Sequence, residues 1–304
     1  MTGLAPEGVE AIAEKQSALS AKIEEKAWRS IVSSLPENDR IRLVSESGHF
    51  AADWLTAIPS EELGYAIPPT HYRMLVRWWL GQTVYPSEGP CPVCGKTNDA
   101  YGYHALTCKK GGETIWRHHS LANECARALQ AAHHQPAREK AIGGQGQRPG
   151  DVYVPHWKLG RPLAMDFAVT HPQQPNNKTL AREVVPAGSW AQRYAEQHKW
   201  MQQELCAQAD VDFQPMVVEC FGAWDPAALT VLHEIAEQYA MHQHVPKSAA
   251  VRILGQRLSF TLARMNLRIL LARGDGFSDP EDGILSLDDA DDAQDAVIDA
   301  VARV

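Results

Sequence analysis

The sequence lacks any run of apolar residues long enough to cross a bilayer, which takes about 20 residues in a helix. Its first 25 residues are polar and helix-prone, without the apolar segment of a signal peptide. No internal repeat is visible, which excludes a solenoid or a propeller. We therefore expect an intracellular protein with a compact core and no membrane contact. We also expect a nuclear location, although these features alone do not indicate it.

Cysteine is also sparse, with six residues in a chain of 304. Three of them stand close together with a histidine, and Cys125, Cys206 and Cys220 are scattered among apolar neighbours. A secreted disulfide framework is therefore not indicated. In a reducing compartment, the three scattered cysteines are expected to be buried thiols.

An excess of positive charge is lacking, because the net charge is −8. Its distribution is uneven: residues 275–304 hold ten acidic residues and one arginine, so this tail carries −9 and the rest of the chain about +1. The tail is typical of a disordered solubilising segment. A broadly basic protein is thus excluded, and any nucleic-acid site must be a local patch.

What the sequence does contain is an ordinary globular composition, 44% hydrophobic and 22% charged, in a chain that can bury a sizeable core. Periodicity predicts a helix over residues 5–35 and short helices over 37–84. The middle section reads as helix, three strands, helix, strand, over 114–133, 137–142, 152–154, 163–170, 189–208 and 213–220, with a hairpin turn at 158–161. Helices over 226–243 and 247–272 follow. This order predicts a compact α/β (α+β) fold.

A metal-binding motif precedes this section. Cys91 and Cys94 form a C-x2-C pair, and His104 and Cys108 form an H-x3-C pair ten residues later. Thiolates and imidazole bind Zn²⁺ tetrahedrally, and two such pairs bring the ligands together from two tight turns. We predict a closed structural zinc site.

Two carboxylates are candidates for a catalytic metal. Asp151 begins the second predicted strand, and Asp166 lies within the apolar third strand, so a hairpin would bring both to one edge of the sheet. An acid in so apolar a run is costly to bury without a partner or a metal. Carboxylate oxygens suit Mg²⁺ or Mn²⁺, which can activate water for phosphodiester hydrolysis.

Basic residues and a third acid complete the candidate set. Lys199 lies on the predicted helix behind the strands, where a lysine could orient the attacking water and stabilise phosphate charge. Glu219 ends an apolar strand and is a further acid candidate. Arg117, His118 and Arg148 are candidates for contacts to nucleic-acid phosphate.

The order of these motifs resembles a known family. Cys91-Pro-Val-Cys94, Tyr101-Gly-Tyr-His104-Ala-Leu-Thr-Cys108, Arg117-His118, Arg148-Pro-Gly-Asp151 and Asp166-Phe-Ala-Val resemble the C-terminal part of site-specific non-LTR retrotransposon polyproteins, over roughly residues 40–272. That part carries a CCHC zinc knuckle and a restriction-endonuclease-like domain of the PD-(D/E)XK type, with an αβββαβ core. The family uses this domain to nick target DNA for priming of reverse transcription.

The resemblance implies roles and boundaries for this chain. Asp151 and Asp166 match the metal-binding acids, and Lys199 matches a lysine that this group displaces to the following helix. The resemblance also divides the chain into a helical N-terminal region (1–88), a zinc knuckle (89–112), a nuclease core (113–225), C-terminal helices (226–274) and an acidic tail (275–304). No polymerase motif is recognisable, so we expect either a detached or a domesticated C-terminal piece of such a polyprotein.

Three functional hypotheses follow. The leading one is a Mg²⁺-dependent DNA endonuclease, with RNA left open as a substrate, and with no small-molecule cofactor. The second is a nucleic-acid-binding module with a decayed active site, because Gln202 and Gln203 stand where the family often has a lysine and a tyrosine. The third is a protein-binding scaffold that uses the acidic tail or the basic helix bearing Arg252, Arg257, Arg264 and Arg268.

Overall fold

The chain was analysed as a computed structural model that describes residues 6–142, 146–174 and 185–274, residues 6–15 by their backbone alone. The predicted acidic tail, 275–304, lies outside these residues. Within the described ranges, no helix is both long enough and apolar enough to cross a membrane.

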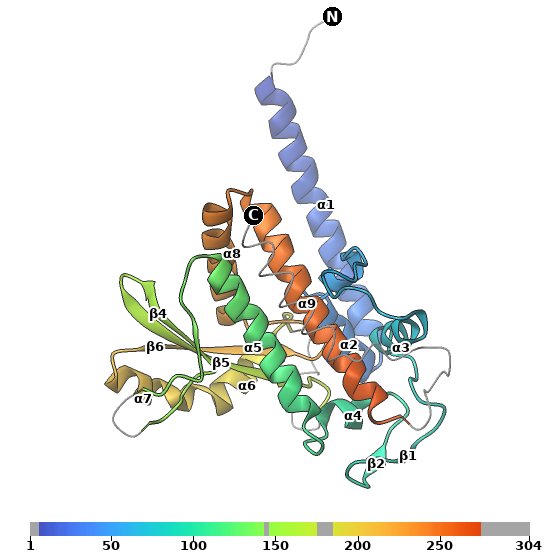
Figure 1. Cartoon of the computed structure of the whole chain (residues 1–304). Helices are drawn as coiled ribbons and strands as arrows, with labels where there is room; N and C mark the ends of the chain where they lie inside the picture. The colour runs from blue at the N-terminus through green and yellow to red at the C-terminus, as the bar shows by residue number, and fades with distance from the viewer. Residues whose placement is uncertain (1–5, 143–145, 175–184, 275–304) are drawn as a thin grey trace, which may run out of the picture.

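Helices make up most of the described chain (Figure 1). They are α1 (Pro6–Ser34), α2 (Glu37–Glu46), α3 (Pro69–Trp79), α4 (Tyr103–Thr107), α5 (Glu113–Ala131), α6 (Ser189–His198), α7 (Gln203–Gln208), α8 (Pro226–Gln243) and α9 (Lys247–Leu271), with 3-10 turns at Asp53–Thr56 and Trp200–Gln202. The predicted helices over 5–35, 114–133, 226–243 and 247–272 match α1, α5, α8 and α9 within two residues.

A mixed sheet of four strands lies at the centre. Its strands β3 (Ala137–Arg138), β4 (Val152–Lys158), β5 (Arg161–Thr170) and β6 (Asp212–Glu219) are ordered β3-β4-β5-β6. β3, β4 and β5 pair antiparallel, whereas β5 and β6 pair parallel and are joined through α6 and α7. The predicted order of helix, three strands, helix and strand is therefore present. A separate pair, β1 (Gly89–Pro90) and β2 (Thr97–Asn98), belongs to the cysteine-rich segment.

The β4–β5 hairpin places the candidate acids. Lys158 pairs with Arg161 across a two-residue turn in which Leu159 and Gly160 have φ values of 51° and 77°. Two left-handed residues in succession give the turn a twist that suits a hairpin. The register shifts between Lys158 and Val154, and beyond this irregularity Val152 lies opposite Met165, so the residues just before β4 lie beside the middle of β5.

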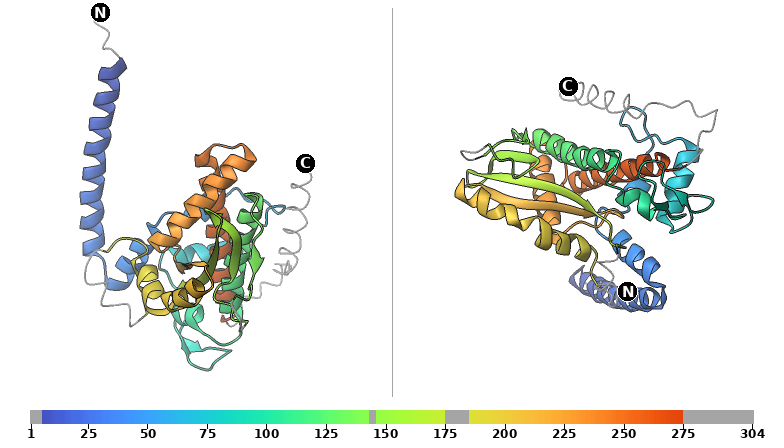
Figure 2. Two further views of the ribbon diagram at one scale, coloured as in Figure 1. Left: turned by 90° about the vertical axis from the view of Figure 1, so that its left-hand side faces the viewer. Right: turned by 90° about the horizontal axis from the view of Figure 1, so that it is seen from below.

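The sheet is covered on both faces (Figure 2). Alternate β5 side chains, including Met165 and Phe167, join the large core formed with α5, α8 and α9. The intervening Ala164 and Ala168 pack against α6, α7 and the 3-10 turn between them. Asp166 shares the second face because strand side chains alternate. The sheet therefore presents Asp166 toward the α6–α7 layer.

Of the N-terminal elements, α3 and the 3-10 turn at Asp53–Thr56 pack against α9, whereas α1 and α2 pack with Trp190 of α6. Trp54, Met74, Leu106, Phe221 and Leu267 belong to one buried cluster that joins α3, α4 and α9 to the end of β6. α1 projects away from this body as a single long helix (Figure 1). The cysteine-rich segment lies beside the C-terminal end of α9, near the start of α5.

The single helix predicted over 189–208 is wrong in one respect. α6 ends at His198, Lys199 follows as its C-cap, and a 3-10 turn leads into α7. Trp200 packs edge-on against Phe213 of β6, with ring centroids 6.1 Å apart. We attribute the break to this packing, since neither proline nor glycine interrupts the helix.

Candidate metal and carboxylate sites

The four predicted zinc ligands form one cluster. The ligand atoms of Cys91, Cys94, His104 and Cys108 all lie within 4.8 Å of one another, and Cys94 Sγ is 3.2 Å from His104 Nε2. Tetrahedral Zn²⁺ with bonds of about 2.3 Å to sulfur holds the sulfur atoms roughly 3.8 Å apart. The cluster is therefore of the right size and composition to hold a metal ion such as zinc.

Local sequence explains how the cluster forms. Gly95 and Gly102 have φ values of 75° and 80°, which residues with a Cβ rarely adopt. The Asp99 carboxylate accepts hydrogen bonds from the backbone N–H groups of Tyr101, Tyr103 and His104, at 3.0, 3.1 and 2.7 Å. These bonds satisfy free donors at the start of α4 and so fix the helix that carries His104.

The Cys91 sulfur is prepared for metal. Burial acts to raise the pKa of its thiol, but the backbone amides of Val93 and Cys94 and the nearby His104 outweigh burial and lower the pKa to about 6. A thiolate is the form that binds zinc. The surroundings of Cys91 thus favour its thiolate. For Cys94, the backbone amide of Lys96 acts to lower the pKa, but burial and the neighbouring Cys91 and Cys108 outweigh it, so the pKa is raised.

The structure also brings Asp151 and Asp166 together. Asp151 precedes β4, and its backbone N–H donates to Met165 O of β5 at 2.8 Å. The two carboxyl groups lie within hydrogen-bonding reach of each other. Their side chains are 14% and 17% exposed, so both are reachable from solvent. A pair of hard oxygen donors at the surface could hold a divalent cation.

Partners on two different elements orient these carboxylates. His118 of α5 lies with Nε2 2.9 Å from Asp151 Oδ1, and the Phe167 backbone N–H donates to Asp151 Oδ2 at 2.7 Å. On the other side, Lys199 Nζ donates to Asp166 Oδ2 at 2.8 Å. The break after α6 therefore leaves Lys199 at the acids.

The environment makes the two acids unequal. For Asp151, burial acts to raise the pKa, but His118, the Phe167 N–H and Asp166 outweigh it, so the pKa is lowered. For Asp166, burial and the neighbouring Asp151 raise the pKa despite the opposing charge of Lys199. Two like charges at close range act against each other's ionisation, and here the pKa of Asp166 is the one that rises.

A scan against protein-family models and a search of curated proteins found no match to this chain. The argument about its function therefore rests on these side chains and their surroundings.

Arg117, predicted to contact phosphate, points into the core instead. It is 4% exposed, and its guanidinium donates to Asn266 Oδ1 at 2.8 Å and to Leu106 O at 3.2 Å. Burial lowers its pKa to about 10. Arg117 thus links α5 to α4 and α9 through hydrogen bonds. The prediction that it contacts nucleic acid is therefore wrong.

Glu219 is likewise not at the carboxylate pair. It is fully buried and accepts hydrogen bonds from the backbone N–H groups of Trp190 and Ala191, at 3.1 and 3.2 Å. Burial raises its pKa to about 7, although these two amides act to lower it. Glu219 therefore caps the start of α6 from the end of β6, four residues beyond the partner of Asp166 in the register.

Other basic groups surround the acids. Arg148 is exposed, with its Nη1 3.2 Å from Glu139 Oε2. Arg138 of β3 was not singled out from the sequence. Its Nη2 lies 3.4 Å from His119 Nδ1, its Nη1 is buried without a hydrogen-bond partner, and its charge acts on Asp151. The sequence predicts a strand that includes Arg138, but only the sheet shows that this side chain lies near Asp151.

The basic residues of α9 do not form a free surface. Arg257 and Arg127 both pair with the buried Glu124, at 3.1 and 3.2 Å. Arg264 is buried, and the Arg268 guanidinium lies 4.1 Å from the centre of the Trp116 ring. Arg252, the fourth arginine of this set, is exposed.

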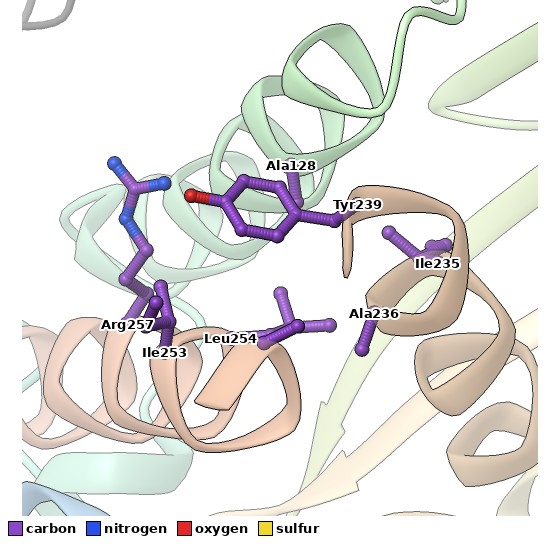
Figure 3. Close-up of a pocket in the computed structure, with 8 residues that line it drawn as sticks. Ala128, Ile235, Ala236, Tyr239, Ile253, Leu254 and Arg257 are labelled. Carbon is purple, nitrogen blue, oxygen red and sulfur yellow. The ribbon is translucent and has the colours of Figure 1, made fainter. Parts of the chain in front are cut away.

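The crevice beside Arg257 is too small for a substrate. It lies between α5, α8 and α9, where Ala128, Tyr239 and Leu254 converge (Figure 3), and it encloses about 10 Å³. That volume accommodates about one water molecule. The carboxylate pair remains the better candidate for chemistry.

Proposed function

We propose that this protein is a metal-dependent endonuclease that hydrolyses a phosphodiester bond of DNA at Asp151 and Asp166. The observation that carries the proposal is the convergence of these two carboxylates with Lys199, from three separate elements. A structural need alone does not account for a pair of partly exposed acids in contact, because their mutual repulsion costs stability.

The donor set fits Mg²⁺ or Mn²⁺. Both side chains offer carboxylate oxygens, and no thiolate is among the partners described for them. A bound divalent ion would polarise the phosphoryl oxygen and lower the pKa of a water molecule. Asp151 and Asp166 would hold that ion.

The surrounding groups supply orientation and charge. The Lys199 ammonium, held on Asp166, orients the attacking water and offsets negative charge that develops on the phosphate. His118 and the Phe167 N–H fix the rotation of the Asp151 carboxylate, so its oxygens are preorganised for metal. Arg138, whose charge acts on Asp151, and the exposed Arg148, three residues before Asp151 in the sequence, are the basic groups that would contact phosphate.

The fold supports the same reading. The order α5, β3, β4, β5, α6, β6, with the acids at the second and third strands, agrees with the αβββαβ order that the resemblance implies, which supports the proposal. The zinc cluster, whose four positions are all filled by protein ligands, has a structural role in this proposal.

A plasmid-nicking assay with Mg²⁺ tests the function. Asp166→Asn keeps the shape of the side chain and removes the metal-binding charge, so nicking should fall on the order of 100-fold or more. Glu219→Gln is the matched control, because it also neutralises an acid of the same sheet but away from the carboxylate pair; it should retain nicking.

Equal nicking by wild type and Asp166→Asn would reject the assignment. If the wild type binds DNA tightly but does not nick it with Mg²⁺ or Mn²⁺, the chain is a binding module whose active site has decayed.

A further inference from the structure

A groove lies along α3, away from the carboxylates. It encloses about 540 Å³, within the range of roughly 300–1,000 Å³ typical of ligand sites. α3 contributes Thr70, Arg73, Met74 and Arg77, and the segment after α3 contributes Thr83, Val84, Tyr85 and Pro86. No role has been assigned above to any of these groups in binding or catalysis.

The charge of the groove has one sign. Its only charged lining residues are Arg73 and Arg77, one helical turn apart on α3, and none of the eight is acidic. α3 itself contains no aspartate or glutamate. In the described part of the chain, no hydrogen bond or ion pair engages the exposed Arg73. The groove thus gathers two positive charges in a part of the chain, residues 1–274, whose net charge is about +1.

The opposite wall is rigidly built. The backbone N–H groups of Val84 and Tyr85 both donate to Ala100 O, at 2.8 and 3.1 Å, which joins the wall to the cysteine-rich segment. The Tyr85 hydroxyl donates to Leu270 O at 2.7 Å. Arg77 Nε donates to Thr83 O at 3.0 Å across the groove. The groove is therefore preformed, which lowers the entropic cost of binding a ligand.

We propose that this groove binds the phosphodiester backbone of a nucleic-acid strand. Arg73 and Arg77 face successive phosphates, and the threonine hydroxyls can donate to phosphate oxygens. Pro86, which is exposed, offers apolar surface to the sugars, while Met74 and Val84 form the buried floor of the groove. An acidic peptide would also meet the two arginines, but only the nucleic acid combines regularly spaced charges with an apolar ribose or deoxyribose edge.

The groove does not depend on cleavage at Asp151 and Asp166, because its residues lie on other elements. As a second contact, it would raise affinity for the strand without taking part in the chemistry. Its loss should therefore raise KM and leave kcat unchanged in any nicking assay. If the protein proves not to cleave DNA, binding of a nucleic-acid strand in the groove can still be measured, so the two proposals can fail separately.

The test is fluorescence anisotropy without added Mg²⁺, using single-stranded DNA, duplex DNA and RNA of roughly 20 nucleotides or base pairs. The variant is Arg73→Glu, and the matched control is Arg252→Glu, an exposed arginine on α9. Arg73→Glu should weaken binding of at least one of the three about tenfold at 50 mM salt, while Arg252→Glu leaves it unchanged. Arg73→Gln should lower the slope of log K against log salt by about 0.7 to 0.9.

Equal effects of Arg73→Glu and Arg252→Glu would overturn the proposal, as would an Arg73→Gln salt slope equal to that of wild type. Displacement of the strand by inorganic phosphate at the same concentration as a competing oligonucleotide would also overturn it, since the site would then recognise a single phosphate.

Discussion

Loss of metal from the cluster of Cys91, Cys94, His104 and Cys108 should destabilise the whole protein and not only its own loop. The segment around the cluster has two strands of two residues and one helix of five, too little structure to fold alone. α4 nevertheless docks in the main body, because Leu106 is 1% exposed within the cluster that also contains Phe221 and Leu267.

The size of the effect can be worked from these contacts. Undocking α4 exposes Leu106, which costs about 2 kcal/mol. It also removes Leu106 O from the buried Arg117 guanidinium, which costs about 2 kcal/mol more. The free energy of unfolding should thus fall by about 4 kcal/mol on chelation, and the melting temperature by roughly 10 °C.

The assay combines metal analysis with thermal unfolding followed by circular dichroism. Cys94→Ser should lose zinc and melt at the temperature of the chelated wild type, while Cys94→His, which keeps a ligand, should retain zinc and most of the stability. Adding zinc back should restore wild type but not Cys94→Ser. A melting temperature unchanged by chelation, with zinc demonstrably removed, would refute the coupling through Leu106 and Arg117.

Two further predictions concern buried charges that the sequence assigned to the active site. Burial raises the pKa of Glu219 from 4.5 to about 7, so ionisation of this side chain destabilises the folded wild type as the pH rises from about 4.5 to 7. In urea unfolding, the free energy of unfolding of the wild type should fall relative to that of Glu219→Gln by up to about 3 kcal/mol over this pH range. A difference between the two proteins that does not change with pH would contradict this prediction. Arg117→Leu should lower the free energy of unfolding by about 3 kcal/mol, because Asn266 Oδ1 and Leu106 O lose their hydrogen-bond donor. The DNA affinity of the folded variant should equal that of the wild type. Weaker DNA binding without a loss of stability would show that Arg117 contacts nucleic acid after all.

The helices and the strand order could be predicted because their signals are local. Pro226 begins α8 directly after Asp225, whose side chain accepts from the Ala228 N–H, and Pro246 precedes α9. Such boundaries depend on a few neighbouring residues. The break at Lys199 could not be predicted in this way, since it follows from Trp200 packing on a strand that comes later in the chain.

The same distinction separates the candidate sites. The sequence by itself determined the cysteine–histidine cluster, because its four ligands lie within 18 residues and glycines at 95 and 102 allow the turns between them. It also identified the acids, since an aspartate in an apolar strand is costly wherever that strand packs.

Only the tertiary structure decided which charged groups meet these acids and which are buried elsewhere. Arg117 and His118 are adjacent in sequence, yet one reaches Asn266 inside the core and the other reaches Asp151. Residues 100° apart on a helix face different surroundings, and those surroundings are set by elements as distant as α9. Burial and pairing depend on packing between remote segments, so no local pattern could have placed Arg117, Glu219 or Arg138.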